Sequence, residues 1–172
     1  MTANLLVDDF ARTDLVSCLG TRWQGTSDRV MGGISRETLA LEEREGRRWL
    51  RLTGRVRLEN EGGFLQMGLD LAPGGGPVDL SAFRAVRLLV RGHGETYGCH
   101  LRTTDCRRPW QSYRSSFVAK PEPAEVDLPL SGFRPHRLEA PFDPAGLRRL
   151  ALVAIGRAFE ADLAVAEVAF YR

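Results

Sequence analysis

Two stretches of sequence decide the fold, Trp23-Gln-Gly-Thr-Ser-Asp28-Arg-Val-Met31-Gly32-Gly33-Ile-Ser35 and Glu59-Asn60-Glu-Gly62-Gly63-Phe64. Each has a polar residue that can hydrogen-bond backbone, then a pair of glycines, then an apolar residue that enters a strand-like run. Paired glycines at such points indicate positive φ angles, or a neighbouring group too close for a Cβ atom. We therefore predict that both stretches are fixed corners of a β structure.

Outside the corners, apolar and polar residues alternate in short runs, as they do in half-buried strands. In the clearest run Leu50, Leu52, Val56 and Leu58 oppose Arg51, Thr53, Arg55 and Arg57, either on one strand or on two strands that meet near Gly54. Further runs cover residues 5–10, 65–71, 86–91, 97–102, 110–118, 125–128, 150–155 and 163–171. About ten short strands, many Gly and Pro turns and no convincing amphipathic helix predict an all-β jelly-roll sandwich. We expect one domain over residues 1–172 with at most short helical turns, one of them at Asp143-Pro144.

The composition of the chain argues against several classes of function. The chain has 24 basic and 22 acidic residues and a formal net charge of +2, so no bulk charge favours nucleic acid or an anionic membrane. No apolar run is long enough to span a bilayer, and residues 1–10 do not read as a secretory signal. We expect a cytoplasmic protein in which Cys18, Cys99 and Cys106 are unpaired thiols.

Several blocks resemble the complex I intermediate-associated protein family. They are Asp28-Arg-Val-Met-Gly-Gly-Ile-Ser35 preceded by Trp23, Glu59-Asn-Glu-Gly-Gly-Phe64, and Val90-Arg-Gly-His-Gly94 with Tyr97. Weaker matches are Leu128-Pro-Leu with Phe133, and Ile155-Gly156. The resemblance implies a galactose-binding-like β-sandwich and a non-enzymatic role, since eukaryotic members assist the assembly of mitochondrial complex I. The framework residues carried over are Trp23, Asp28, Met31, Gly32, Gly33, Asn60, Gly62, Gly63 and Phe64.

The chain departs from the family pattern in three ways. No transit peptide is apparent, which favours a bacterial stand-alone member. His93 stands where the family often has Asp, and Pro123-Ala124 stand near a position where it often has Trp.

The two corners allow two interpretations. Asp28 and Asn60 either form a shared polar site for a sugar hydroxyl, a cation or a partner backbone, or they cap loop amides, as Asp and Asn commonly do in turns. Met31 and Phe64 are expected in the core, and Trp23 is expected to be a packed anchor.

An arginine-rich sheet face is the first candidate binding surface, and a protein partner, such as a respiratory or membrane-associated complex, is its expected ligand. The alternative is a carbohydrate-binding module that stacks sugars on Trp110, Tyr97 or Tyr113 and contacts them through Arg102. An exposed Trp110 beside Arg102 would favour the sugar. The candidate binding residues are Arg51, Arg55, Arg57, Gln66, Tyr97, His100, Arg102, Trp110 and Tyr113.

No metal or catalytic site is predicted. His93, Cys99, His100 and Cys106, with Asp105, match no compact zinc spacing, and strand alternation sends Cys99 and His100 to opposite faces. A structural calcium held by Asp8, Asp9 and turn carbonyls is conceivable, because sandwiches of this kind often contain one. Catalytic motifs are absent, and the acidic run Glu42, Glu43 and Glu45 is expected at a solvated hairpin end.

Overall fold

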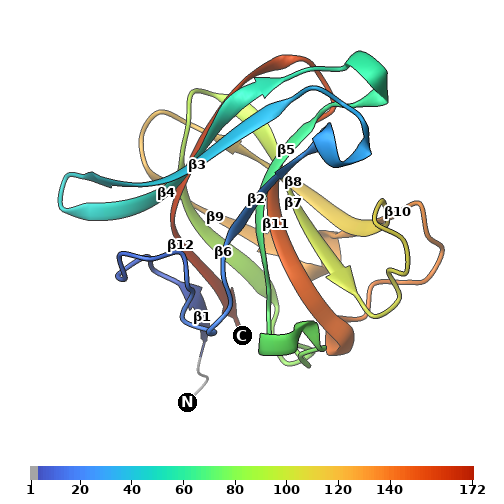
Figure 1. Ribbon diagram of the computed structural model, residues 1–172. Coiled ribbons are helices and arrows are strands. Elements are labelled where there is room, and N and C mark those ends of the chain that lie inside the picture. Colours follow the sequence, from blue (N-terminus) through green and yellow to red (C-terminus); the bar gives the residue numbers. More distant parts are fainter. Residues whose placement is uncertain (1–3) are drawn as a thin grey trace.

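Two antiparallel sheets pack face to face in the computed structural model, which describes residues 4–172 (Figure 1). The first sheet has the order β3-β4-β12-β6-β9, and β1 pairs with the C-terminal part of β12 beyond the segment that pairs with β4. Its strands are β1 (Leu5–Asp8), β3 (Arg36–Arg44), β4 (Arg47–Val56), β6 (Ala85–Arg91), β9 (Ala124–Pro129) and β12 (Phe159–Tyr171).

The second sheet has the order β10-β8-β7-β11-β5-β2. Its strands are β2 (Gln24–Ser27), β5 (Phe64–Asp70), β7 (Glu95–Thr103), β8 (Ser112–Ala119), β10 (Arg134–His136) and β11 (Leu147–Ile155). The described residues contain no α-helix, only short 3-10 turns, η1 (Asp28–Met31), η2 (Glu59–Glu61), η3 (Pro73–Gly75), η4 (Leu130–Gly132) and η5 (Pro144–Gly146). The predicted all-β sandwich is therefore confirmed.

Strand β4 shows how the alternating pattern becomes structure. Leu50 and Leu52 are fully buried between the sheets, whereas Arg51 points to the outer face of the first sheet. The strand runs without a break through Gly54, where a Cβ atom would lie 2.1 Å from the carbonyl oxygen of Arg36. Of the two arrangements that the sequence allowed, one strand is correct, and glycine permits the close approach of β3.

The core fills the space between the sheets with side chains from nearly every strand. Tyr97 also ties the sheets together, because its hydroxyl accepts a 2.9 Å hydrogen bond from the backbone N–H of Asp162 on β12. The largest fully buried side chains are Trp23, Tyr97, Tyr113, Phe170, Leu50, Leu52, Leu65, Met67, Leu69, Leu88, Leu101 and Leu147.

Two local predictions are also confirmed. The β3–β4 hairpin turns at Glu45 and Gly46, both with positive φ, so the acidic run lies at a hairpin end. The carboxylate of Asp143 accepts a 3.0 Å hydrogen bond from the Ala145 N–H and caps η5.

Candidate functional site

The two glycine corners meet at the side chain of Asp28. Its carboxylate, buried at the start of η1, accepts hydrogen bonds from the backbone N–H groups of Ser35 (2.9 Å), Gly63 (2.5 Å) and Phe64 (3.0 Å). The Ser35 hydroxyl donates a further short bond to the same carboxylate. Asp28 therefore caps loop amides from both corners, as the second interpretation of this residue predicted.

The paired glycines are needed because this carboxylate lies against them. A Cβ atom at Gly33 would lie 2.2 Å from Asp28 Oδ1, and one at Gly62 would lie 2.8 Å from the carboxyl carbon. Asn60 has a φ of 57°, in the left-handed region that asparagine tolerates better than most residues. Each corner thus combines a tight turn with a close approach to one buried charge.

Burial by itself would raise the pKa of Asp28. The hydrogen bonds from the Ser35 side chain, Gly63, the Ser35 backbone and Phe64 outweigh burial and lower that pKa below its ordinary value. The carboxylate is accordingly charged at neutral pH, and its charge is neutralised by oriented N–H dipoles rather than by a cation.

The corners hold four large apolar side chains in solvent. Val30 is 72% exposed, Met31 60%, Leu58 49% and Ile34 39%. We call these four residues the corner patch. The Ser35 hydroxyl also accepts a 2.8 Å hydrogen bond from the N–H of Arg57, which ties the segment that carries Ile34 to the segment that leads to Leu58.

The structure corrects two predictions at the corners and confirms another. Met31 was expected in the core but is exposed, because it ends a 3-10 turn that projects beyond the sheet. Trp23 is a packed anchor as predicted, 1% exposed, with its indole N–H donating to Asp8 Oδ2 at 2.9 Å. Phe64 was also expected in the core but is half-buried on the outer face of β5, because Leu65 and Met67 occupy the core-facing positions of this strand.

The arginine-rich face is neutralised by acidic neighbours. Arg51 bridges Asp162 at 2.7 Å and Glu42 at 3.0 Å on the outer face of the first sheet. Arg55 pairs with Glu160 at 2.8 Å, and Arg57, just beyond β4, pairs with Glu59 at 2.9 Å. These three arginines lie on a salt-bridged surface rather than on a surface of free cations.

The other candidate binding residues belong to the second sheet. Gln66, His100 and Arg102 lie on its outer face, so these candidate residues do not form one surface with the arginines of β4. Tyr97 and Tyr113 are 1% and 0% exposed, because they share the parity of the core residues on β7 and β8.

A hollow of about 450 Å³ lies on this outer face, over β7, β8 and the end of β11. His100 and Arg114, which are cross-strand partners, form its floor together with Gly98. A Cβ atom at Gly98 would lie 2.9 Å from His100 Nε2, so the glycine makes room for the imidazole ring. Other lining residues are Thr96, Ser116, Ile155 and Arg157.

Burial dominates the electrostatics of the hollow. Burial, with the nearby charges of Arg114 and His136, lowers the pKa of His100 to about 3, so its imidazole is neutral. Burial and Arg137 also lower the pKa of Arg114, which nevertheless keeps its charge at neutral pH. Our sequence interpretation missed Arg114, although it shares the parity opposite to Tyr113 and Phe117 and so belongs to the outer face.

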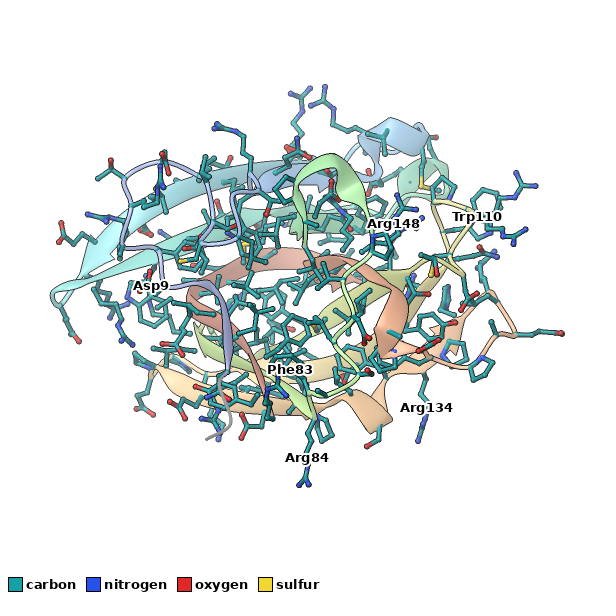
Figure 2. The ribbon with its side chains drawn as sticks, turned by 90° about the horizontal axis from the view of Figure 1, so that it is seen from below. Asp9, Phe83, Arg84, Trp110, Arg134 and Arg148 are labelled. Atoms are coloured by element: carbon teal, nitrogen blue, oxygen red, sulfur yellow. The ribbon has the colours of Figure 1, made fainter. Side chains whose placement is uncertain are left out.

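Trp110 is 48% exposed in the β7–β8 loop and stands at the edge of the molecule in Figure 2. Arg102 holds this loop, because its Nη1 donates to the carbonyl oxygens of Arg108 (3.0 Å), Pro109 (2.9 Å) and Gln111 (2.9 Å). Trp110 is thus available for stacking beside Arg102, while much of the donor capacity of Arg102 is used within the protein.

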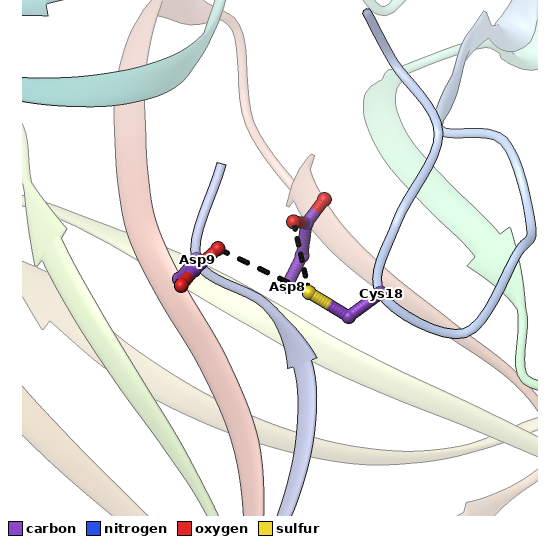
Figure 3. A group of neighbouring side chains, drawn as sticks. All are labelled: Asp8, Asp9 and Cys18. Atoms are coloured by element: carbon purple, nitrogen blue, oxygen red, sulfur yellow. Dashed lines mark hydrogen bonds between the residues drawn. The ribbon is translucent and has the colours of Figure 1, made fainter. Parts of the chain in front are cut away.

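Asp8, Asp9 and Cys18 form the group that most resembles a metal site among the described residues (Figure 3). Asp8 already accepts bonds from Phe10 N–H and the Trp23 indole, and burial raises the pKa of the Cys18 thiol. A protonated thiol is no metal ligand, and calcium needs six to eight oxygen atoms. The three side chains alone do not provide that many oxygen atoms, and the hydrogen bonds of Asp8 give the group a structural role.

The expected thiol state and strand alternation are confirmed. Cys99 and Cys106 are buried, Cys18 is exposed, and all three are unpaired. Cys99 lies in the core while His100 lies on the outer face, so these residues cannot share a metal ion.

Solved structures that are similar to this chain include carbohydrate-binding modules. The chain is similar to a family 11 module from Clostridium thermocellum in complex with a β-1,3-1,4-mixed-linked tetrasaccharide, with a TM-score of 0.76, 10% identity, and 99% of this chain and 96% of that chain covered. It is also similar to the family 30 module of a Clostridium thermocellum cellulosomal cellulase, with a TM-score of 0.69, 16% identity and coverage of 98% and 97%. No curated protein sequence matches significantly.

The fold is a β-sandwich of the kind found in carbohydrate-binding modules. The model of the Complex I intermediate-associated protein 30 family matches residues 9–164, and the chain belongs to that family. The predicted family is thereby confirmed. Within residues 4–172, no helix has the length and apolar character needed to cross a bilayer.

Proposed function

We propose that this chain is a non-catalytic, assembly-factor-like domain that binds a protein partner, with the corner patch at the centre of the contact. One observation carries the proposal. Four of the seven large apolar side chains that are exposed in the described part of the chain gather on the two corners that Asp28 ties together. Clustered exposed apolar side chains are typical of interaction sites.

The rigidity of the corner supports this role. A surface that is already ordered loses little conformational entropy on binding, so more of the contact energy appears as affinity. The hydrogen bonds of Asp28 hold both corners in one arrangement. The family name concerns complex I, so we propose a respiratory or other membrane-associated complex as the class of partner.

Affinity capture from a lysate of the source organism tests the proposal. A Val30→Ser, Met31→Ser variant is expected to capture the partner at least about tenfold less than the wild type, because both side chains would lie in the contact. Their present exposure means that the substitutions change stability by only about 0.5 kcal/mol.

An Arg51→Ala, Arg55→Ala, Arg57→Ala variant is the matched control, because it alters the salt-bridged surface and leaves the corner patch intact. It is expected to retain the partner. Loss of the partner in this variant alone, with binding that weakens as salt rises, would move the contact to the arginine face. If the wild type captures no respiratory or membrane protein, the proposal fails.

Saccharide binding is the second candidate, favoured by the exposure of Trp110 in the loop that Arg102 holds. On this alternative, a mixed-linkage β-glucan in a native gel would retard the wild type. A Trp110→Ala variant would migrate freely, since stacking on an exposed aromatic ring carries such contacts. Equal migration of both proteins with and without glucan would exclude this candidate.

A further inference from the structure

The hollow on the second sheet contains arginine but no acidic side chain among its lining residues. None of the ten residues that line it is acidic, although Arg114 and Arg157 are both among them. Arg157 pairs with Glu95, which leaves Arg114 as the cation of the hollow that has no carboxylate partner in residues 4–172. Arg114 uses only its Nε, which donates to the Ser112 hydroxyl at 2.9 Å.

Several other arginines on the sheet faces are compensated by nearby acceptors. Arg51, Arg55, Arg87 and Arg149 each have a carboxylate within about 3 Å, and Arg102 is surrounded by carbonyl oxygens. Burying part of a guanidinium group without a counter-charge costs free energy, as the lowered pKa of Arg114 indicates. A site of this kind gains from an incoming anion more than an exposed, paired arginine does.

The neighbours of Arg114 suit a carboxylate. A guanidinium presents a planar fork that matches the two oxygens of a carboxylate, and the two terminal nitrogens of Arg114 make no hydrogen bond within the described structure. Ser116 and Thr96 add hydroxyl donors at the same hollow. The neutral His100 ring offers a donor and does not repel an anion.

The position of the hollow connects it to the corner patch. Ile155 lines the hollow and is the cross-strand partner of Phe64, the residue whose N–H is bound by Asp28. A protein segment that contacts the corner patch can therefore continue across Phe64 and Ile155 and reach Arg114. This continuity makes a segment of the bound protein a better fit to the hollow than a free small anion.

We infer that the hollow is a carboxylate-binding subsite, with Arg114 as its anchor, for a glutamate or aspartate side chain of the protein partner. The inference rests on the proposed function for the source of the carboxylate. The subsite adds a charged anchor to an otherwise apolar contact, and so it selects partners that carry an acidic residue beside an apolar segment.

A titration with a capped peptide of four consecutive glutamates tests the subsite directly, with amide NMR shifts of the full chain as the readout. In the wild type we expect saturable shifts at Gly98, His100 and Ser116. Arg114→Gln is expected to weaken binding at least about tenfold, because it removes a charge-assisted, two-pronged contact. The matched control Arg55→Gln, which removes an exposed and paired arginine, is expected to bind as the wild type does.

Equal binding by the wild type and Arg114→Gln, or shifts confined to other surfaces, would overturn the subsite. A capped peptide of four glutamines should cause no shifts. If inorganic phosphate binds at the hollow and the glutamate peptide does not, the carboxylate assignment is wrong. Thermal unfolding of Arg114→Gln verifies that the variant is folded.

The two experiments distinguish a failure of the protein-binding function from a failure of the carboxylate subsite. If the corner-patch variant loses its partner while the glutamate peptide leaves the hollow unchanged, the protein-binding function stands and the subsite falls. If the peptide binds through Arg114 but the wild type captures no partner, the subsite is real and its carboxylate comes from another source.

Discussion

Asp28→Asn is expected to lower the free energy of unfolding by about 3 kcal/mol or more, the largest stability effect predicted for this chain. The buried carboxylate accepts three backbone hydrogen bonds and one from a hydroxyl. Hydrogen bonds to a charged group contribute about 1.5–3 kcal/mol each, and buried donors left without a partner add a further cost. The asparagine side chain has one acceptor oxygen, and its NH2 group faces backbone N–H donors with which it cannot form a hydrogen bond.

The free energy of unfolding is measured by urea denaturation. An unchanged slope of this free energy against urea concentration would show that two-state unfolding persists. For a domain of this size the expected loss corresponds to a fall in Tm of about 6–12 °C. Gly33→Ala is the companion variant, because its Cβ atom would collide with Asp28 Oδ1 while leaving the charge in place. A loss below about 1 kcal/mol in both variants would mean that the corners do not depend on Asp28.

Asp28 also predicts how acid acts on the corners. Its pKa in the folded state is lower than in the unfolded state, so its stabilisation is complete at neutral pH. That stabilisation is lost as the pH falls through the folded-state pKa. The Asp28→Asn variant should therefore lose less stability than the wild type on strong acidification.

The second large expected effect is a fall in the free energy of unfolding as the pH is lowered, and it comes from His100. It begins at a higher pH than the effect of Asp28. Its pKa is about 3 in the folded protein, against about 6.5 in the unfolded chain. Between these values the unfolded state binds a proton that the folded state does not, so stability must fall as the pH falls. The slope approaches about 1.4 kcal/mol per pH unit for this one group.

Unfolding free energies at pH 7.5, 6, 5 and 4.5 measure this effect. His100→Gln removes the titrating group and should flatten the decrease, although His136 contributes in the same direction because burial, Arg114 and Arg137 lower its pKa too. His93→Gln is the control, since His93 is exposed and bonds only the Glu160 carbonyl oxygen. Parallel curves for the wild type and His100→Gln would contradict the neutral, buried state of this imidazole.

Much of the fold could be predicted because each strand of a two-layer sandwich has one buried face and one exposed face. Apolar and polar residues therefore alternate along the strand. Leu50, Leu52 and Val56 are core residues as their parity predicts, whereas Leu58 has the same parity but is exposed, because it lies beyond the end of β4. Strands β2, β3 and β10 were not anticipated, because β2 and β10 are very short and β3 exposes much of both faces. A strand whose two faces are similarly exposed has no clear alternation in its sequence, so it is recognised only through the strand with which it pairs.

The candidate site was harder to predict than the fold. Tyr97 shares the parity of Cys99 and Leu101, so its burial could have been read from the sequence. The same rule assigns Arg114 to the outer face of β8. The exposure of Met31 could not be predicted, because the geometry of a turn rather than strand periodicity decides where its side chain points.

Strand β12 has a consequence for how the protein is made. It lies at the centre of the first sheet, where β4 and β1 pair with one edge and β6 with the other. A ribosome supplies residues 159–171 only after the other strands of that sheet have emerged, so β4 and β6 wait with unpaired edges until then. Late closure exposes the nascent chain to aggregation, so folding of this domain during synthesis would benefit from a chaperone.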